Sequence, residues 1–262
     1  MDALAADILI IFERGVPNGL EFLFRWAHVL VGIAWIGLLY YFNFVQVPAF
    51  AELDAGARNQ ATDKLASRAL WWFRWAAVAT VVTGFLILLA QRSATGGSLL
   101  FASDYWRTYP GISISAGILL ALTMFANVWL VIWPNQKKVI ANARNVLAGG
   151  EADPAAAAAG RKALMASRQN AIFSFTMLFF MVATSHFYGA WGSDPSGGER
   201  ALFWAITIVL WLVLECNALG LLGGTGTGGP RVIYDSHKNA IITGLVLVVV
   251  WYVVWILAFG AP

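Results

Sequence analysis

Two of the three histidines in the chain lie within long apolar segments, where a titratable side chain is costly and marks a functional site. His28 lies about six residues into the apolar run 22–45, and His186 about five residues before the end of the run 172–191. At about 1.5 Å rise per residue, both imidazoles are expected about 8–9 Å below the same membrane boundary. Two imidazoles at matched depth, on helices that cross in opposite directions, predict a shared metal ion or haem iron.

The neighbours of these histidines favour the haem. Gly32 follows His28 by four residues and Gly189 follows His186 by three, so each glycine shares a helix face with its histidine. A missing side chain at that position lets a flat macrocycle lie against the helix, and Trp35 continues the same face. The sequence therefore predicts haem b between His28 and His186, with buried axial ligands setting its potential. The alternative is that each imidazole hydrogen-bonds to a neighbouring helix.

A second polar group is expected toward the opposite membrane face. Glu215 is a carboxylate in an apolar run, which is costly unless it is paired or neutral. Arg74 lies at a comparable depth and is the expected partner, with Asn127 close by. An arginine with amides suits a planar anion that carries several oxygens and N–H groups, so these three residues are catalytic candidates. The alternative is a structural ion pair within the bundle. Other polar residues at this level are Asn43, Arg168, Gln169, Asn170 and Asn217.

The elements that must position these residues are membrane-spanning helices. The 262 residues are 60% hydrophobic and 12% charged, whereas soluble domains carry about 25% charged residues. Six runs are long enough to cross a bilayer, and their lack of alternation excludes a barrel. We therefore predict one all-α transmembrane domain over residues 1–262, with a helical cytoplasmic loop over 134–171. The predicted spans are 22–45, 71–90, 112–133, 172–191, 201–222 and 241–259.

The distribution of basic residues predicts the orientation. Twelve of the 17 Lys and Arg residues lie on one side: eleven in the segments that join spans one to two, three to four and five to six, and Arg74 near the start of the second span. The positive-inside rule then places both termini outside, which is periplasmic in a bacterial inner membrane. The first twelve residues lack the basic start of a cleavable signal peptide. The single cysteine, Cys216, excludes an internal disulfide, and no basic patch indicates nucleic acid.

Three segments resemble the membrane domain of bacterial membrane-bound urate oxidases, also called urate hydroxylases. The first runs from Arg25 to Gln46 and includes Ala34-Trp35-Ile36-Gly37 and Tyr41-Phe42-Asn43-Phe44-Val45-Gln46. The second runs from Asn127-Val128-Trp129 to Trp133-Pro134-Asn135-Gln136-Lys137. The third runs from Ser167-Arg168-Gln169-Asn170 to His186-Phe187. The helix with His28 is also similar to the haem-binding helix of all-helical bacterial protoporphyrinogen oxidases.

The resemblance implies oxidation of urate to 5-hydroxyisourate, with electrons passing through haem b to a periplasmic cytochrome c or a membrane quinone. Members of the family carry a cytochrome c domain after the last span, but this sequence has no Cys-x-x-Cys-His segment. We therefore expect a separate acceptor, and a homo-oligomer remains open. Two other functions remain open: a transporter or channel for a small anion or metal ion, and a haem electron-transfer subunit without its own substrate.

Overall fold

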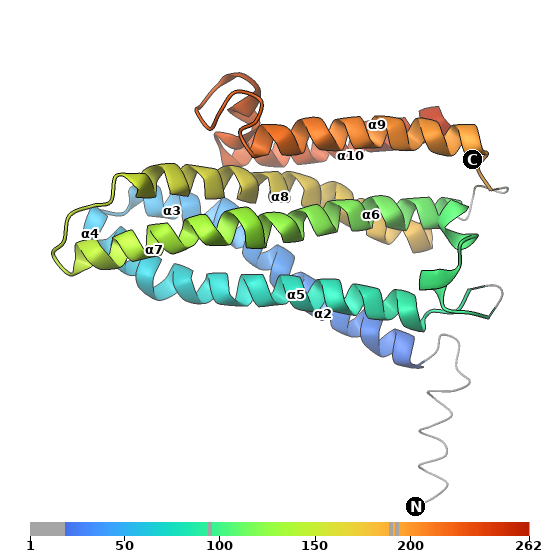
Figure 1. The fold of residues 1–262 in the computed structure, drawn as a ribbon, viewed down its shortest axis with the longest axis horizontal. Coiled ribbons are helices and arrows are strands. Elements are labelled where there is room, and N and C mark those ends of the chain that lie inside the picture. The colour runs from blue at the N-terminus through green and yellow to red at the C-terminus, as the bar shows by residue number, and fades with distance from the viewer. Residues whose placement is uncertain (1–18, 94–95, 189–190, 192–193, 262) are drawn as a thin grey trace, which may run out of the picture.

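The structure, a computed structural model, describes residues 19–93, 96–188, 191 and 194–261, and these form helices joined by short turns. The long helices lie side by side along one axis (Figure 1). The predictions for Gly189 and for the first twelve residues lie outside the described residues.

The first three predicted spans belong to helical rods that are longer than expected. The first rod comprises α2 (Gly19–Tyr40), the π-helical segment η1 (Tyr41–Gln46) and α3 (Val47–Glu52). The second comprises α4 (Ala55–Ala61), the π-helical η2 (Thr62–Ala66) and α5 (Ser67–Ala90). The third comprises α6 (Tyr109–Ala126), the π-helical η5 (Asn127–Ile132) and α7 (Trp133–Leu147). Each rod thus contains one π-helical segment, a feature that is frequent at functional sites.

Short capping interactions fix where these rods begin. The Asp54 side chain accepts a hydrogen bond from the Ala57 N–H at the start of α4, and Thr108 accepts one from the Gly111 N–H at the start of α6. Each cap satisfies a backbone donor that the first helical turn leaves free. Two single-turn helices, η3 (Leu99–Phe101) and η4 (Tyr105–Arg107), lie between the second and third rods.

The C-terminal half contains three long helices. These are α8 (Ala155–His186), α9 (Gly197–Ala218) and α10 (His237–Phe259), with the 3₁₀ segment η7 (Gly229–Tyr234) before α10. Ser196 and Glu199 form a capping box at the start of α9, because each side chain bonds the backbone N–H of the other. Residues 134–171, predicted as a helical loop, comprise nearly all of α7, a turn, and the first half of α8.

In the part of the chain that the structure describes, five helices are long and apolar enough to cross a membrane, as in a multi-pass membrane protein. They are the three rods, α9 and α10. The predicted fourth span, within α8, is not among them. α8 contacts α6, α7 and α10 and is largely buried, including its polar residues Arg168, Gln169 and Asn170. Protein surrounds this helix, so it retains polar side chains that a lipid-facing helix excludes.

A glycine brings α10 close to α8. A Cβ atom built on Gly244 would lie 2.4 Å from the Phe175 ring and 3.3 Å from the Ile172 carbonyl oxygen. Small residues allow this kind of close approach between membrane helices. Large aromatic side chains then fill the space around the contact, and Trp251 and Trp255 of α10 are fully buried.

Candidate functional site

His28 lies against α5 and has a defined tautomer. Its Nδ1 is 2.9 Å from the Thr80 carbonyl oxygen and 3.1 Å from Thr83 Oγ1. A carbonyl can only accept, so in the neutral ring Nδ1 carries the proton and Nε2 is left with a free lone pair. Histidines that bind metals through Nε2 are typically held in this way, with the Nδ1–H donated to a carbonyl oxygen.

His186 is the last residue of α8 and is exposed. Its Nδ1 lies 3.2 Å from the Val182 carbonyl oxygen of its own helix. Because α8 ends at His186, this histidine does not lie five residues inside the helix as the sequence predicts.

The two histidines share a level in the bundle but not a position. Tyr40 of α2 and Ser174 of α8 form a hydrogen bond of 2.9 Å between their hydroxyls. His28 precedes Tyr40 by twelve residues and His186 follows Ser174 by twelve, so antiparallel helices carry both about 18 Å from this contact. The N-terminal part of α2, however, runs to the far side of α5 from α8 (Figure 1). Among the described residues, the hydrogen bonds of His28 are with α5 and that of His186 is with its own helix.

The other residues predicted to line a haem site differ from one another in their surroundings. A Cβ on Gly32 would have no atom within 4 Å, so this glycine borders open space, whereas Trp35 is buried in the core. Gly84 of α5 is in contact with His28, because a Cβ there would lie 3.1 Å from the imidazole Cε1. His28 therefore has one ring nitrogen free to bind a metal, and no hydrogen bond joins it to His186 among the described residues. The haem b site between the two histidines stays a prediction.

Glu215 and Asn127 meet in a buried hydrogen-bond chain. The Asn127 Nδ2 donates to Asn170 Oδ1 at 3.0 Å and to Glu215 Oε2 at 3.3 Å. Asn170 Nδ2 in turn donates to the Met124 carbonyl oxygen at 2.9 Å. The chain joins the third rod, α8 and α9, so it holds three helices together where the π-helical turn of η5 begins.

Arg74 does not pair with Glu215. Its guanidinium carbon lies 3.2 Å from the centroid of the Trp133 ring and 5.7 Å from that of Trp129. Only 8% of Arg74 is exposed, its Nε has no hydrogen-bond partner, and no ion pair to it is found within the described part of the chain. Stacking on an aromatic ring holds the cation without using its N–H donors. A buried cation without a counter-ion is costly, so Arg74 is a candidate to bind an anion.

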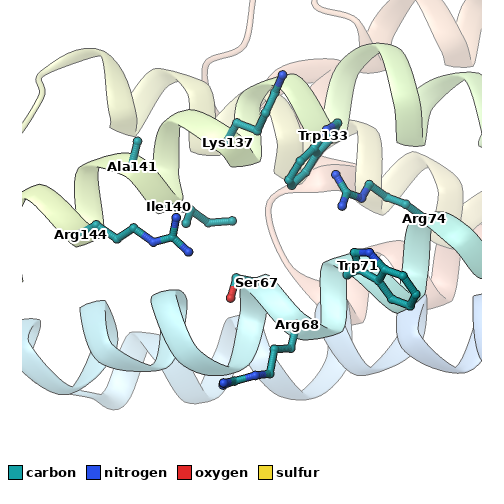
Figure 2. A pocket seen from close by; sticks show the side chains of 9 residues that line it. All are labelled: Ser67, Arg68, Trp71, Arg74, Trp133, Lys137, Ile140, Ala141 and Arg144. Atoms are coloured by element: carbon teal, nitrogen blue, oxygen red, sulfur yellow. The ribbon is translucent and has the colours of Figure 1, made fainter.

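Arg74 lines a cavity of about 470 Å³ between α5 and α7. Figure 2 shows the guanidinium beside Trp133 and facing the space between the two helices, with Trp71 below it. The nine lining residues include four cations and no carboxylate; the cations are Arg68, Arg74, Lys137 and Arg144. Asp63, at the edge of the cavity, neutralises one of these cations, because its Oδ1 lies 2.5 Å from Arg144 Nε. The cavity thus combines net positive charge with indole rings, which suits a flat anion.

A second, smaller cavity of about 170 Å³ lies between η1, α5, α7 and α8. None of its lining residues is charged, and its polar members are Asn43, Gln46, Gln136 and Ser167. We refer to it as the amide chamber. No motif or spacing in the sequence predicts that these four residues share a cavity. All of them nevertheless fall in the three segments that carry the family resemblance.

Residues 107–213 match the family described as "Urate oxidase N-terminal". The match covers less than half of the chain, and it shows that this segment is similar to the family. No curated protein and no solved structure matched the chain. The urate oxidase N-terminal segment contains Asn127, His186 and the α7 wall of the cationic cavity, together with Gln136 and Ser167 of the amide chamber. His28, Arg74 and Glu215 lie outside it and are brought to it by the fold.

Proposed function

We propose that the chain is a membrane-bound oxidoreductase that oxidises urate to 5-hydroxyisourate. The observation that carries the proposal is the match of residues 107–213 to the urate oxidase N-terminal family. Urate gains a hydroxyl group from water and loses two electrons and two protons. The electrons leave to a cytochrome c or a quinone.

Urate binds in the cationic cavity between α5 and α7. Urate is a flat anion near neutral pH, and the cavity offers Arg74 as a counter-ion that is already stacked and desolvated. The planar guanidinium pairs with adjacent oxygen or nitrogen acceptors through parallel hydrogen bonds. Trp71 and Trp133 supply aromatic walls for the ring system. Arg68 and Lys137 raise the local anion concentration at the mouth of the cavity.

Glu215 and Asn127 have an indirect role in this proposal. They are bonded to one another and are absent from the residues that line the cationic cavity. Their chain with Asn170 fixes the start of η5, and η5 leads directly into Trp133. We therefore assign them to positioning the α7 wall of the cavity.

Haem b stays a separate proposal, and it would supply one-electron chemistry when bound. His28 is the residue that would hold it, because its Nδ1–H is donated to the Thr80 carbonyl oxygen and its Nε2 is free.

The proposed topology has six spans, with α8 as the sixth, in a bacterial inner membrane. The excess of Lys and Arg places the cationic cavity on the cytoplasmic side and both termini in the periplasm. The indoles of Trp71, Trp72 and Trp75 are partly exposed beside the cavity, as expected for an aromatic belt at the membrane boundary.

The test uses membranes that contain the full chain. We expect them to consume urate and form 5-hydroxyisourate without releasing hydrogen peroxide, and to do so only when an electron acceptor is present. Peroxide produced in step with urate loss would contradict electron delivery to a carrier. Urate uptake into vesicles without oxidation would instead favour a transporter.

A further inference from the structure

The amide chamber contains two buried hydrogen-bond acceptors that lack donors. Asn43 is completely buried, and its Nδ2 donates to the Leu39 carbonyl and to Ser167 Oγ, both at 2.8 Å. Two acceptors on Nδ2 fix the orientation of this amide, and its Oδ1 has no partner in the part of the chain that the structure describes. The Oε1 of Gln46, one turn further along, is also buried without a partner. Unsatisfied buried acceptors are costly, so a donor is expected to occupy the chamber.

The walls of the chamber restrict the chemistry of that donor. Its lining contains no charged residue, and apolar side chains such as Phe42, Leu70 and Phe73 surround the amides. Phe42 and Phe73 pack edge to face with ring centroids 5.4 Å apart. An anion such as urate would be buried here without a counter-ion, which is strongly unfavourable. A small, neutral, flat ring with polar groups at its edges fits these walls.

The chamber and the cationic cavity share two helices. Consecutive residues of α5 and of the η5–α7 rod face the two spaces in turn, the first of each pair toward the chamber and the second toward the cavity. The pairs are Leu70 and Trp71, Phe73 and Arg74, Ile132 and Trp133, and Gln136 and Lys137. The two spaces therefore lie on different faces of the same two helices, and an electron leaving the cationic cavity crosses this helix pair to reach the chamber.

We propose that the amide chamber between η1, α5, α7 and α8 binds the headgroup of a membrane quinone, which accepts the electrons from urate. This inference rests on the proposed function and names its acceptor. Urate and water give 5-hydroxyisourate with release of two electrons and two protons, and the quinone takes up both to form a quinol. Each carbonyl of the quinone becomes a hydroxyl, and no other oxidant is needed.

The polar groups of the chamber suit both forms of this ligand. The carbonyl oxygens of the oxidised ring accept hydrogen bonds from the hydroxyl of Ser167 and from glutamine N–H groups. After reduction the two hydroxyl groups donate, and the free Oδ1 of Asn43 and Oε1 of Gln46 are the acceptors that they need. The unsatisfied acceptors favour the reduced form, which draws electrons away from urate.

The experiment measures binding and turnover separately, with decylubiquinone as the probe and the purified full chain in detergent. Calorimetry is expected to detect decylubiquinone binding to the wild type in the absence of urate. Gln46→Met and Gln136→Met, on different helices, are expected to raise the Kd for decylubiquinone about tenfold. The KM for urate should stay unchanged in both. The matched control is Gln60→Met, because Gln60 is exposed on α4 and remote from the chamber lining.

The outcomes distinguish the two proposals. The quinone site would be overturned if the wild type does not bind decylubiquinone. It would also be overturned if both chamber variants bind decylubiquinone with the Kd of the wild type. If urate is nevertheless oxidised with ferricytochrome c as acceptor, the proposed function stands alone. Quinone binding that depends on Gln46 and Gln136, without any urate-driven reduction, would support the chamber and contradict the urate activity.

Discussion

The guanidinium of Arg74 stacks 3.2 Å from the centre of the Trp133 ring, and this contact takes the place of the ion pair with Glu215 that the sequence predicts. Glu215 is satisfied by the neutral Asn127 amide instead. Among the described residues, Arg74 therefore has no counter-ion. The three predicted catalytic residues are thus separated, with Arg74 at the cationic cavity and Asn127 and Glu215 in a buried hydrogen-bond chain.

Substitution of Arg74 tests the anion site. Arg74→Gln is expected to raise the KM for urate about tenfold, because a charge-assisted hydrogen bond contributes about 1.5–3 kcal/mol. Arg74→Lys should recover part of the loss, since it keeps the charge but not the planar pair of donors. Initial rates of urate consumption over a range of concentrations measure the effect.

Arg58→Gln is the matched control for Arg74→Gln. The Arg58 side chain is partly exposed on α4 and donates to the Leu53 carbonyl oxygen, away from the cavity lining. It should leave the KM for urate unchanged. An equal KM in the wild type and Arg74→Gln would remove Arg74 from the substrate site.

The haem prediction is tested by absorption spectra of the purified protein. If His28 is an axial ligand, His28→Ala should abolish or shift the Soret band. Gly84→Ala should shift it to a smaller extent, because the added Cβ would lie 3.1 Å from the imidazole. Gly37→Ala on the same helix is the control, since a Cβ there would also have no atom within 4 Å. His186→Ala reports whether the second histidine contributes at all. A spectrum without a haem band would remove the cofactor.

Much of the fold is predictable from hydrophobicity, because five of the six predicted spans coincide with long apolar helices. The sixth, α8, is correctly predicted as a helix, but its central position gives it a polar character that a hydropathy window penalises. Helix ends are less predictable. Caps and π-helical turns allow the rods to continue well past the last apolar residue, as at Asp54 and Gln46.

Sequence spacing predicts the distance between residues along a helix, but not the direction around it. His28 and His186 are each twelve residues from the Tyr40–Ser174 contact, and their equal depth stays a prediction. The splay of α2 from α8 depends on side-chain packing along α5, which no spacing rule contains. The amide chamber has the same origin, because its residues come from four elements and each is unremarkable alone.

Asn127 tests the structural assignment of the buried chain. Asn127→Leu leaves Glu215 and Asn170 without their shared donor and is expected to destabilise the protein by about 1–2 kcal/mol. Thermal unfolding in detergent measures the change in Tm, and Gln60→Leu on the exposed face of α4 is the control. If the Tm is unchanged and the kcat is strongly decreased, Asn127 is a catalytic residue and not a structural one.

Asp235 tests how the turn before α10 is held. Its Oδ1 accepts from Arg161 Nη2 at 2.7 Å and its Oδ2 from the Gly228 N–H at 2.8 Å. Partial burial alone would raise the pKa of this carboxyl. The Gly228 and Arg161 hydrogen bonds outweigh it, however, and hold the pKa below its ordinary value.

A carboxyl whose pKa is lower in the folded state stabilises the fold above its unfolded pKa of about 4 and loses that contribution as the pH falls through the folded pKa. Asp235→Asn is therefore expected to lower the stability by about 1 kcal/mol near pH 7. The difference in Tm from the wild type should shrink as the pH falls below about 4. Thermal melts between neutral and acidic pH measure this, with the exposed Glu52→Gln as control. A difference in Tm that stays constant over the whole pH range would show that the Asp235 charge does not hold the turn.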